Sequence, residues 1–114
     1  MNYFLLKPKY VTAEITAAYE HITDKLEREG HTVYNPLFQK NIFRLKEQYD
    51  HDCESHCAYV HRMPGFDEYC LLRFMMALNN YDVLITPANR KDPSELALYN
   101  YACTIGIFIK EIQV

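Results

Sequence analysis

The sequence has no tryptophan and only three glycines among its 114 residues, and it lacks any long apolar run. No stretch approaches the roughly 18 consecutive apolar residues that cross a bilayer, so we expect no membrane partner. The opening residues MNYFLLKPKY also lack the apolar core and the small-residue cleavage site of a signal peptide. A cytoplasmic location is therefore expected.

An excess of positive charge is absent as well. The formal net charge is −3, so no overall field favours nucleic acid, and we expect no nucleic-acid partner. Hydrophobic residues make up 49% of the chain and charged residues 24%, which is typical of a globular protein. The aromatic content of 14% is higher than a disordered chain would carry. The length suits one domain with one core, spanning 1–114.

The four cysteines are expected to be reduced, because no secretion signal accompanies them. Cys103 lies in an apolar helical stretch and is predicted to be a small core residue. Cys53, Cys57 and His61 lie in a segment rich in histidine and form a weak candidate zinc site. Their C-x3-C-x3-H spacing does not match a zinc knuckle, so we expect neither a metal nor a cofactor.

Short apolar runs alternate with segments of helical period along most of the chain. Strands are predicted at 3–6, 31–34, 82–86 and 107–109. Helices are predicted at 12–29, 37–50, 67–79 and 93–104, whereas 51–66 shows no clear period. This β-α-β-α-α-β-α-β order indicates an α/β protein with helices on both faces of a parallel sheet. We expect a small flavodoxin-like or Rossmann-like three-layer sandwich with a short, mostly parallel four-stranded sheet.

Sheets of this kind bind ligands at the carboxyl ends of their strands. In this chain those ends carry basic and amide side chains, and the loop 87–93 leads into a helix N-terminus, which suits an anion such as phosphate. The predicted ligand-binding residues are Lys7, Pro8, Lys9, Asn35, Asn89, Arg90, Lys91 and Ser94.

Glu95 is the one candidate catalytic residue, because it lies on the first turn of that helix. The run Asp92-Pro93-Ser94-Glu95 also fits a capping box, with Asp92 as N-cap, Pro93 at N1 and Glu95 at N3. We favour the cap, in which the carboxylate of Glu95 binds backbone N–H groups.

Three stretches resemble the nucleoside 2-deoxyribosyltransferase-like family, including a small phage and bacterial branch that mostly lacks an assigned function. They are LEREGHTVYNP at 26–36, ALNNYDVLITP at 77–87 and YACTIGIFI at 101–109, and the strand with proline FLLKP precedes them. The resemblance covers most of the chain except 37–66, which diverges.

The resemblance implies an oligomeric α/β sandwich that acts on the N-glycosidic bond of nucleosides. In active members a glutamate on the last helix attacks the anomeric carbon and an aspartate orients the sugar, since an oxocarbenium-like centre needs a nearby anion. By register, the glutamate position falls on Leu98 and the aspartate position on Phe74 in this sequence. Lys7 stands where the family has a glycine before the first-strand proline.

Three functions stay open at this point. The first is a non-catalytic nucleotide or nucleoside binder, expected to be a homo-oligomer; in a phage it could sequester a nucleotide signal of host defence, an anti-defence role. The second is an active N-glycosidase or deoxyribosyltransferase that uses Glu95. The third is a protein–protein interaction module in which the pocket is vestigial. We expect the first, because the two acidic positions that the resemblance implies are apolar.

Overall fold

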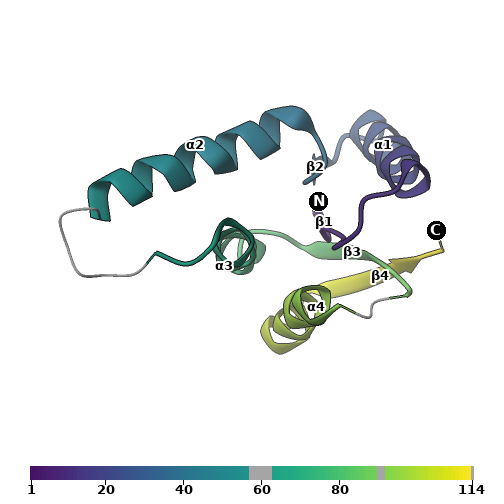
Figure 1. Ribbon diagram of the computed structural model, residues 1–114. Coiled ribbons are helices and arrows are strands. Elements are labelled where there is room, and N and C mark those ends of the chain that lie inside the picture. The colour runs from purple at the N-terminus through teal and green to yellow at the C-terminus, as the bar shows by residue number, and fades with distance from the viewer. Residues whose placement is uncertain (57–62, 90–91, 114) are drawn as a thin grey trace.

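The computed structural model describes residues 1–56, 63–89 and 92–113, and it leaves out the side chains of residues 55 and 56. The elements follow the predicted order (Figure 1): β1 (Asn2–Leu5), α1 (Ala13–Arg28), β2 (Thr32–Tyr34), α2 (Gln39–His56), α3 (Phe66–Leu78), β3 (Val83–Pro87), α4 (Pro93–Ile105) and β4 (Phe108–Ile112). The strands form one sheet in the order β2-β1-β3-β4, and each neighbouring pair is parallel. The predicted small flavodoxin-like or Rossmann-like sandwich is confirmed.

The central strands β1 and β3 are buried on both faces of the sheet. Leu84 of β3 pairs with Phe4 of β1, and Ile85 pairs with Leu5. Phe4 and Leu84 belong to the core on the α3 and α4 side, whereas Leu5 and Ile85 belong to the core on the α1 side. This double burial explains why both strands read as unbroken apolar runs instead of alternating sequences.

Helix α1 covers one face of the sheet with the stripe that its 3.6-residue period predicts. The hydroxyl oxygen of Thr12 caps the helix by accepting a hydrogen bond of 3.2 Å from the Ile15 backbone N–H. Ile15 and Tyr19 are buried against Leu5 of the sheet. Gly30, with φ of 90°, follows the last turn, as predicted from the sequence.

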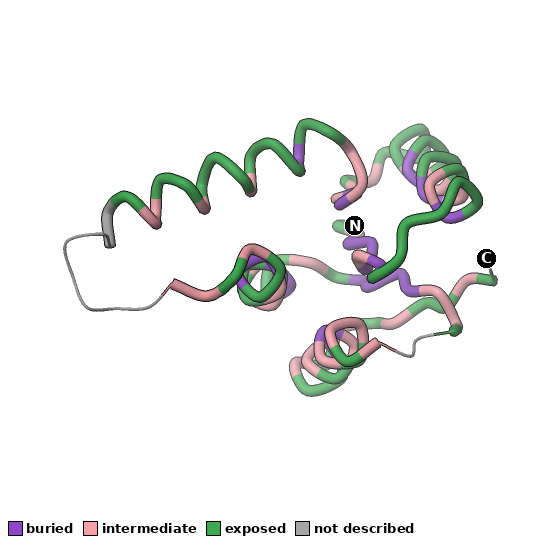
Figure 2. Tube along the Cα trace, viewed as in Figure 1, coloured by how far each residue is buried: buried purple, intermediate pink, exposed green. Residues whose placement is uncertain are grey.

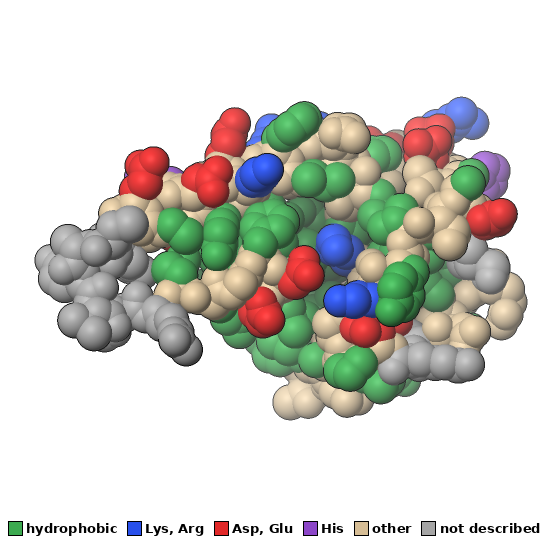
Figure 3. All heavy atoms as spheres, viewed as in Figure 1, with side chains coloured by type: hydrophobic (Ala, Val, Ile, Leu, Met, Phe, Trp, Pro, Cys, Tyr) green, Lys and Arg blue, Asp and Glu red, His purple; other side chains and the backbone are tan. Residues whose placement is uncertain are grey.

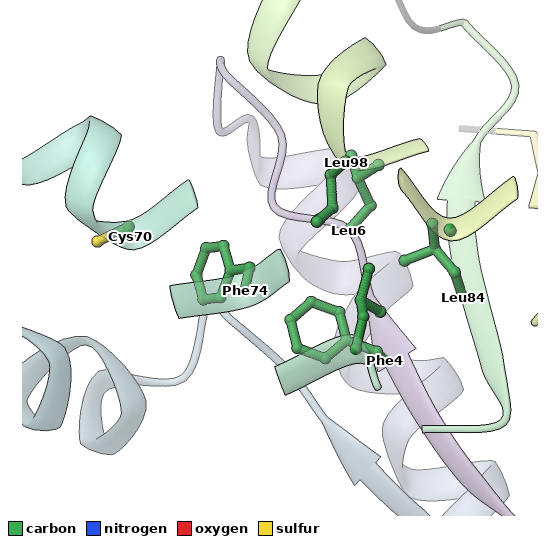
Figure 4. Close-up of a cluster of buried hydrophobic side chains, with 8 residues drawn as sticks. Phe4, Leu6, Cys70, Phe74, Leu84 and Leu98 are labelled. Carbon is green, nitrogen blue, oxygen red and sulfur yellow. The ribbon is translucent and has the colours of Figure 1, made fainter. Parts of the chain in front are cut away.

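Helices α3 and α4 cover the other face and pack against each other (Figure 1). Phe74 of α3 and Leu98 of α4 meet Phe4 of β1 and Leu6, the residue after β1, in one apolar cluster (Figure 4). Full burial of side chains of this size contributes roughly 1.5–3 kcal/mol each. Cys103 is the exception to the predicted core, because it is exposed on the outer side of α4. The prediction of a buried thiol there was wrong, since the inward stripe of α4 is carried by Leu98 and Ala102.

Helix α2 is longer than predicted and extends beyond the edge of the sheet (Figures 1 and 2). It continues from residue 50, the predicted end, to His56, and much of it is exposed. Two hydrogen bonds of 2.7 Å attach its outer half: the Tyr49 hydroxyl donates to the Pro64 carbonyl, and the Tyr69 hydroxyl donates to Asp52. These partners lie far along the chain, so the periodicity of 37–50 alone could not show that the helix continues.

We predict that Tyr69→Phe weakens this attachment in a pH-dependent way. The hydrogen bond from Tyr69 lowers the pKa of Asp52 below its ordinary value. A lowered folded-state pKa gives stability that is present above the unfolded pKa near 4 and is lost as the pH falls through the folded value. The variant should therefore have a lower urea midpoint than the unmodified chain at pH 7.

The same difference should shrink as the pH falls through the folded-state pKa of Asp52, because the protonated carboxyl loses the charge that the hydrogen bond from Tyr69 stabilises. Tyr10→Phe is the matched control, because the Tyr10 side chain is 78% exposed and its hydroxyl has no hydrogen-bond partner among the described residues. A Tyr69→Phe midpoint difference that stays constant as the pH is lowered from 7 until the carboxylates are protonated would show that Asp52 plays no part.

Candidate functional site

A cavity of about 370 Å³ opens where the chain leaves β1, between the start of α3 and the start of α4. Strand β1 connects through α1 to β2 on one side, whereas β3 connects through α4 to β4 on the other side. The chain therefore moves toward one edge of the sheet after β1 and toward the other edge after β3, so the segments that follow these two parallel strands diverge. Such a switch point is the usual ligand site of a doubly wound sheet.

The floor of the cavity is apolar. Leu98, Phe74 and Cys70 are 2%, 4% and 4% exposed (Figure 4). Leu71, Pro8 and Pro93 add further apolar surface to the lining. Burial raises the pKa of the Cys70 thiol, and the nearby charge of Lys7 partly offsets this effect. Leu98 and Phe74 are the two positions at which the family resemblance implies acids. In this chain both line the cavity with carbon atoms only, so neither side chain is a nucleophile or an acid–base group.

The rim of the cavity carries charges of both signs. Lys7 and Lys9 come from the segment after β1, Asp67 and Glu68 from the first turn of α3, and Asp92 from the start of α4. In the space-filling view, basic side chains lie beside acidic ones near the centre of the face, between α3 and α4 (Figure 3). A ligand in the cavity would thus meet cations from the β1 side and carboxylates from the α3 side.

Helix α4 begins as the sequence predicts. Asp92 is its N-cap and accepts a 2.9 Å hydrogen bond from the Ser94 backbone N–H as well as one from the Ser94 hydroxyl, and Pro93 occupies N1. The Ser94 side chain, and then the backbone N–H groups and the charge of Lys9, keep the pKa of Asp92 below its ordinary value. The helix N-terminus is therefore already occupied by a carboxylate of its own chain.

Glu95 has a different role from the one expected. Its Oε1 accepts a 2.9 Å hydrogen bond from the Lys9 backbone N–H, so it ties α4 to the segment after β1. Burial and, secondarily, the charge of Glu95 raise the pKa of Tyr19, whose hydroxyl donates to the Leu6 carbonyl in the same segment. Among the described contacts, the return half of the capping box to Asp92 is absent, so that part of the prediction was wrong. Glu95 is not one of the residues that line the cavity.

The predicted ligand-binding residues separate into three groups. Lys7, Pro8, Lys9 and Ser94 line the cavity. Asn35 and Asn89 do not, and Arg90 and Lys91 lie outside the described residues.

Asn35 has a structural role in place of the predicted ligand contact. It is 1% exposed; its amide nitrogen donates to the Thr23 hydroxyl at 3.2 Å, and its Oδ1 accepts from the Leu37 N–H at 2.9 Å. Both polar ends of the side chain are thus occupied in shaping the turn after β2.

Among the described residues, the histidine-rich segment forms no metal centre. Cys57 and His61 lie outside the described residues, and Cys53 is a half-buried free thiol on α2. Within the described ranges no group of three potential ligands is close enough to hold a metal ion. The described cysteines Cys53, Cys70 and Cys103 are free, as expected for reduced thiols.

Asp67 and Glu68 are the site residues that sequence reasoning missed. Their position could have been predicted from the direction in which α3 runs relative to the strands. A crossover helix runs antiparallel to the strands that it connects, so the first turn of α3 must lie at the carboxyl edge of the sheet, beside the segment after β1. The two acids open the helix at this edge.

Comparisons with protein-family models, with curated proteins and with solved structures find no match for this chain. By its fold and its cavity, the chain is a doubly wound α/β protein with a pocket of mixed charge at its switch point. Within the described residues, no helix has the length and the apolar character needed to traverse a bilayer.

We predict that Glu95 acts as a tether. Glu95→Ala should lower the free energy of unfolding by about 1 kcal/mol, because the Lys9 N–H loses its acceptor. Glu95→Gln should cost less, since the amide oxygen still accepts the bond. Urea unfolding and hydrogen exchange of the Lys9 amide measure both effects. Equal effects of the two substitutions on exchange at Lys9 would contradict the tether.

We also predict that Cys70 is alkylated by iodoacetamide at least about tenfold more slowly than Cys103 at pH 8, because it is 4% exposed and its pKa is raised. Peptide mass spectrometry of timed samples measures both rates in one experiment. In 8 M urea the two rates should converge. Equal rates under native conditions would contradict the closed floor of the cavity.

Proposed function

We propose that this chain binds a nucleoside or a nucleotide in the strand-end cavity and holds it without cleaving it. The observation that carries the proposal is the cavity itself, with an apolar floor and a charged rim at the switch point of a doubly wound sheet. Its volume of about 370 Å³ falls within the range of small-molecule pockets.

The lining offers a partner for each part of such a ligand. Phe74 and Leu98 present apolar surface to a base or to the carbon face of a sugar. Asp67 and Glu68 accept hydrogen bonds from sugar hydroxyls or base amino groups, and Lys7 and Lys9 attract a phosphate. The resemblance to nucleoside 2-deoxyribosyltransferase-like proteins agrees with this ligand class.

Absence of cleavage is proposed on the chemistry of the floor. Attack on an anomeric carbon needs a carboxylate against the sugar. Leu98 and Phe74 occupy the two positions from which the family delivers its acids, and the carboxylate of Glu95 accepts the Lys9 N–H outside the lining. Asp67 and Glu68 remain as carboxylates at the rim, and we assign them to the sugar hydroxyls and not to the anomeric carbon.

Titration calorimetry and thermal shift with nucleosides and their 5′-monophosphates test the proposal. A ligand at 100 times its dissociation constant should raise the free energy of unfolding by about 2.7 kcal/mol. Lys7→Ala and Lys9→Ala should each weaken monophosphate binding by about tenfold and leave nucleoside binding within about twofold, because only the phosphate needs the cation.

Lys25→Ala is the matched control, since Lys25 lies in the last turn of α1 and does not line the cavity. Chromatography of the same incubations for free base tests the second half of the proposal. Base release that disappears in Glu68→Gln or Glu95→Gln would show that the protein is an enzyme. An absence of saturable binding by every nucleoside and monophosphate would overturn the function.

A further inference from the structure

A second cavity, of about 360 Å³, lies on the same face of the sheet between α2 and the end of α3. Phe74 lines both cavities, so its ring separates them. The first half of α3 faces the strand-end cavity, whereas Arg73, Met76 and Ala77 of its second half face this one. The second cavity is therefore a distinct space with its own lining.

Aromatic rings form its inner wall. Phe4 stacks on Tyr34 with 4.9 Å between ring centroids and an interplanar angle of 19°. Tyr81 meets Phe4 edge-on at 5.2 Å and 82°, and Phe74 does so at 5.5 Å and 70°. A flat ring entering this space would meet the half-buried rings of Tyr34 and Tyr81, because Phe4 is only 1% exposed and Phe74 only 4% exposed.

Two half-buried tyrosines of this wall have hydroxyl groups without a partner among the described residues. Among the described residues, neither the Tyr34 hydroxyl nor the Tyr81 hydroxyl makes a hydrogen bond, although burial raises the pKa of Tyr34 to about 12 and also raises the pKa of Tyr81. Buried tyrosine hydroxyls usually find a partner. Each of these is a donor available to an acceptor from outside the chain.

The charge around the cavity is positive. Arg73 lines it, and Arg44 lies close enough to Tyr34 for its charge to act on that phenol. In the described part of the chain, neither arginine forms an ion pair and no lining residue is acidic. This differs from the strand-end cavity, whose rim carries carboxylates.

We propose that the second cavity is a binding site for a small planar aromatic carboxylate, with the ring against Tyr34 and Tyr81 and the carboxylate toward Arg73. An arginine and two phenol hydroxyls are donors that match the acceptors of a carboxylate. The site is independent of the nucleoside or nucleotide function proposed for the other cavity.

The test is a titration of the full chain with 2-naphthoate, followed by the NMR signals of the Met76 and Ala77 methyl groups, which line the cavity. Both signals should shift and saturate with one dissociation constant. Arg73→Ala should raise that constant about tenfold, and Arg73→Lys less, because lysine keeps the charge but not the planar fork. Tyr34→Phe and Tyr81→Phe keep the rings and should each raise it a few-fold.

Arg28→Ala is the matched control, since Arg28 lies on the last turn of α1. Lys7→Ala should also leave naphthoate binding unchanged, which separates this site from the strand-end cavity. Shifts at Met76 and Ala77 that do not saturate would overturn the proposal. So would equal constants for Arg73→Ala and Arg28→Ala, or equal binding of the uncharged 2-methylnaphthalene.

Discussion

The pairing of β1 with β3 is the constraint on which the rest of the structure depends. Because these two parallel strands lie side by side at the centre of the sheet, each must be buried on both faces, which requires α1 on one side and α3 with α4 on the other. The same pairing creates the strand-end cavity, since the chain continues toward opposite edges of the sheet after β1 and after β3. Core and site therefore have one origin, and Phe74 and Leu98 belong to both.

The polar contacts of the site serve positioning more than reaction. Glu95 holds the segment after β1 against α4, Asp92 caps α4, and the buried amide of Asn35 shapes the turn after β2. From the sequence alone, each of these residues is predicted to contact a ligand or lies next to a residue with that prediction. Each instead accepts a hydrogen bond from a backbone N–H, and such a bond contributes roughly 0.5–1.5 kcal/mol. What remains available to a ligand is the charge on the rim and the carbon surface beneath it.

The two cavities differ in the chemistry they present, although they share the ring of Phe74. One has carboxylates and lysines around an apolar floor, and the other has arginine and phenol donors around an aromatic wall. Their separation follows from the direction of α3, which passes over the sheet and exposes a different set of side chains at each end.

The order of elements, the two helix stops at glycine and the cap at Asp92 could be predicted from the sequence, because they depend on neighbouring residues and on local period. Lys7, Pro8, Lys9 and Ser94 could be placed at the site for a related reason: strand ends in a parallel sheet share one edge. Four features could not be predicted from the sequence: the partner of Glu95, the burial of Asn35, the exposure of Cys103 and the continuation of α2 to His56. Each depends on a contact or a packing direction set by residues distant in the chain, such as the 86-residue separation between Lys9 and Glu95. Sequence period indicates that a side chain points inward or outward, but only the assembled layers decide which group it meets there.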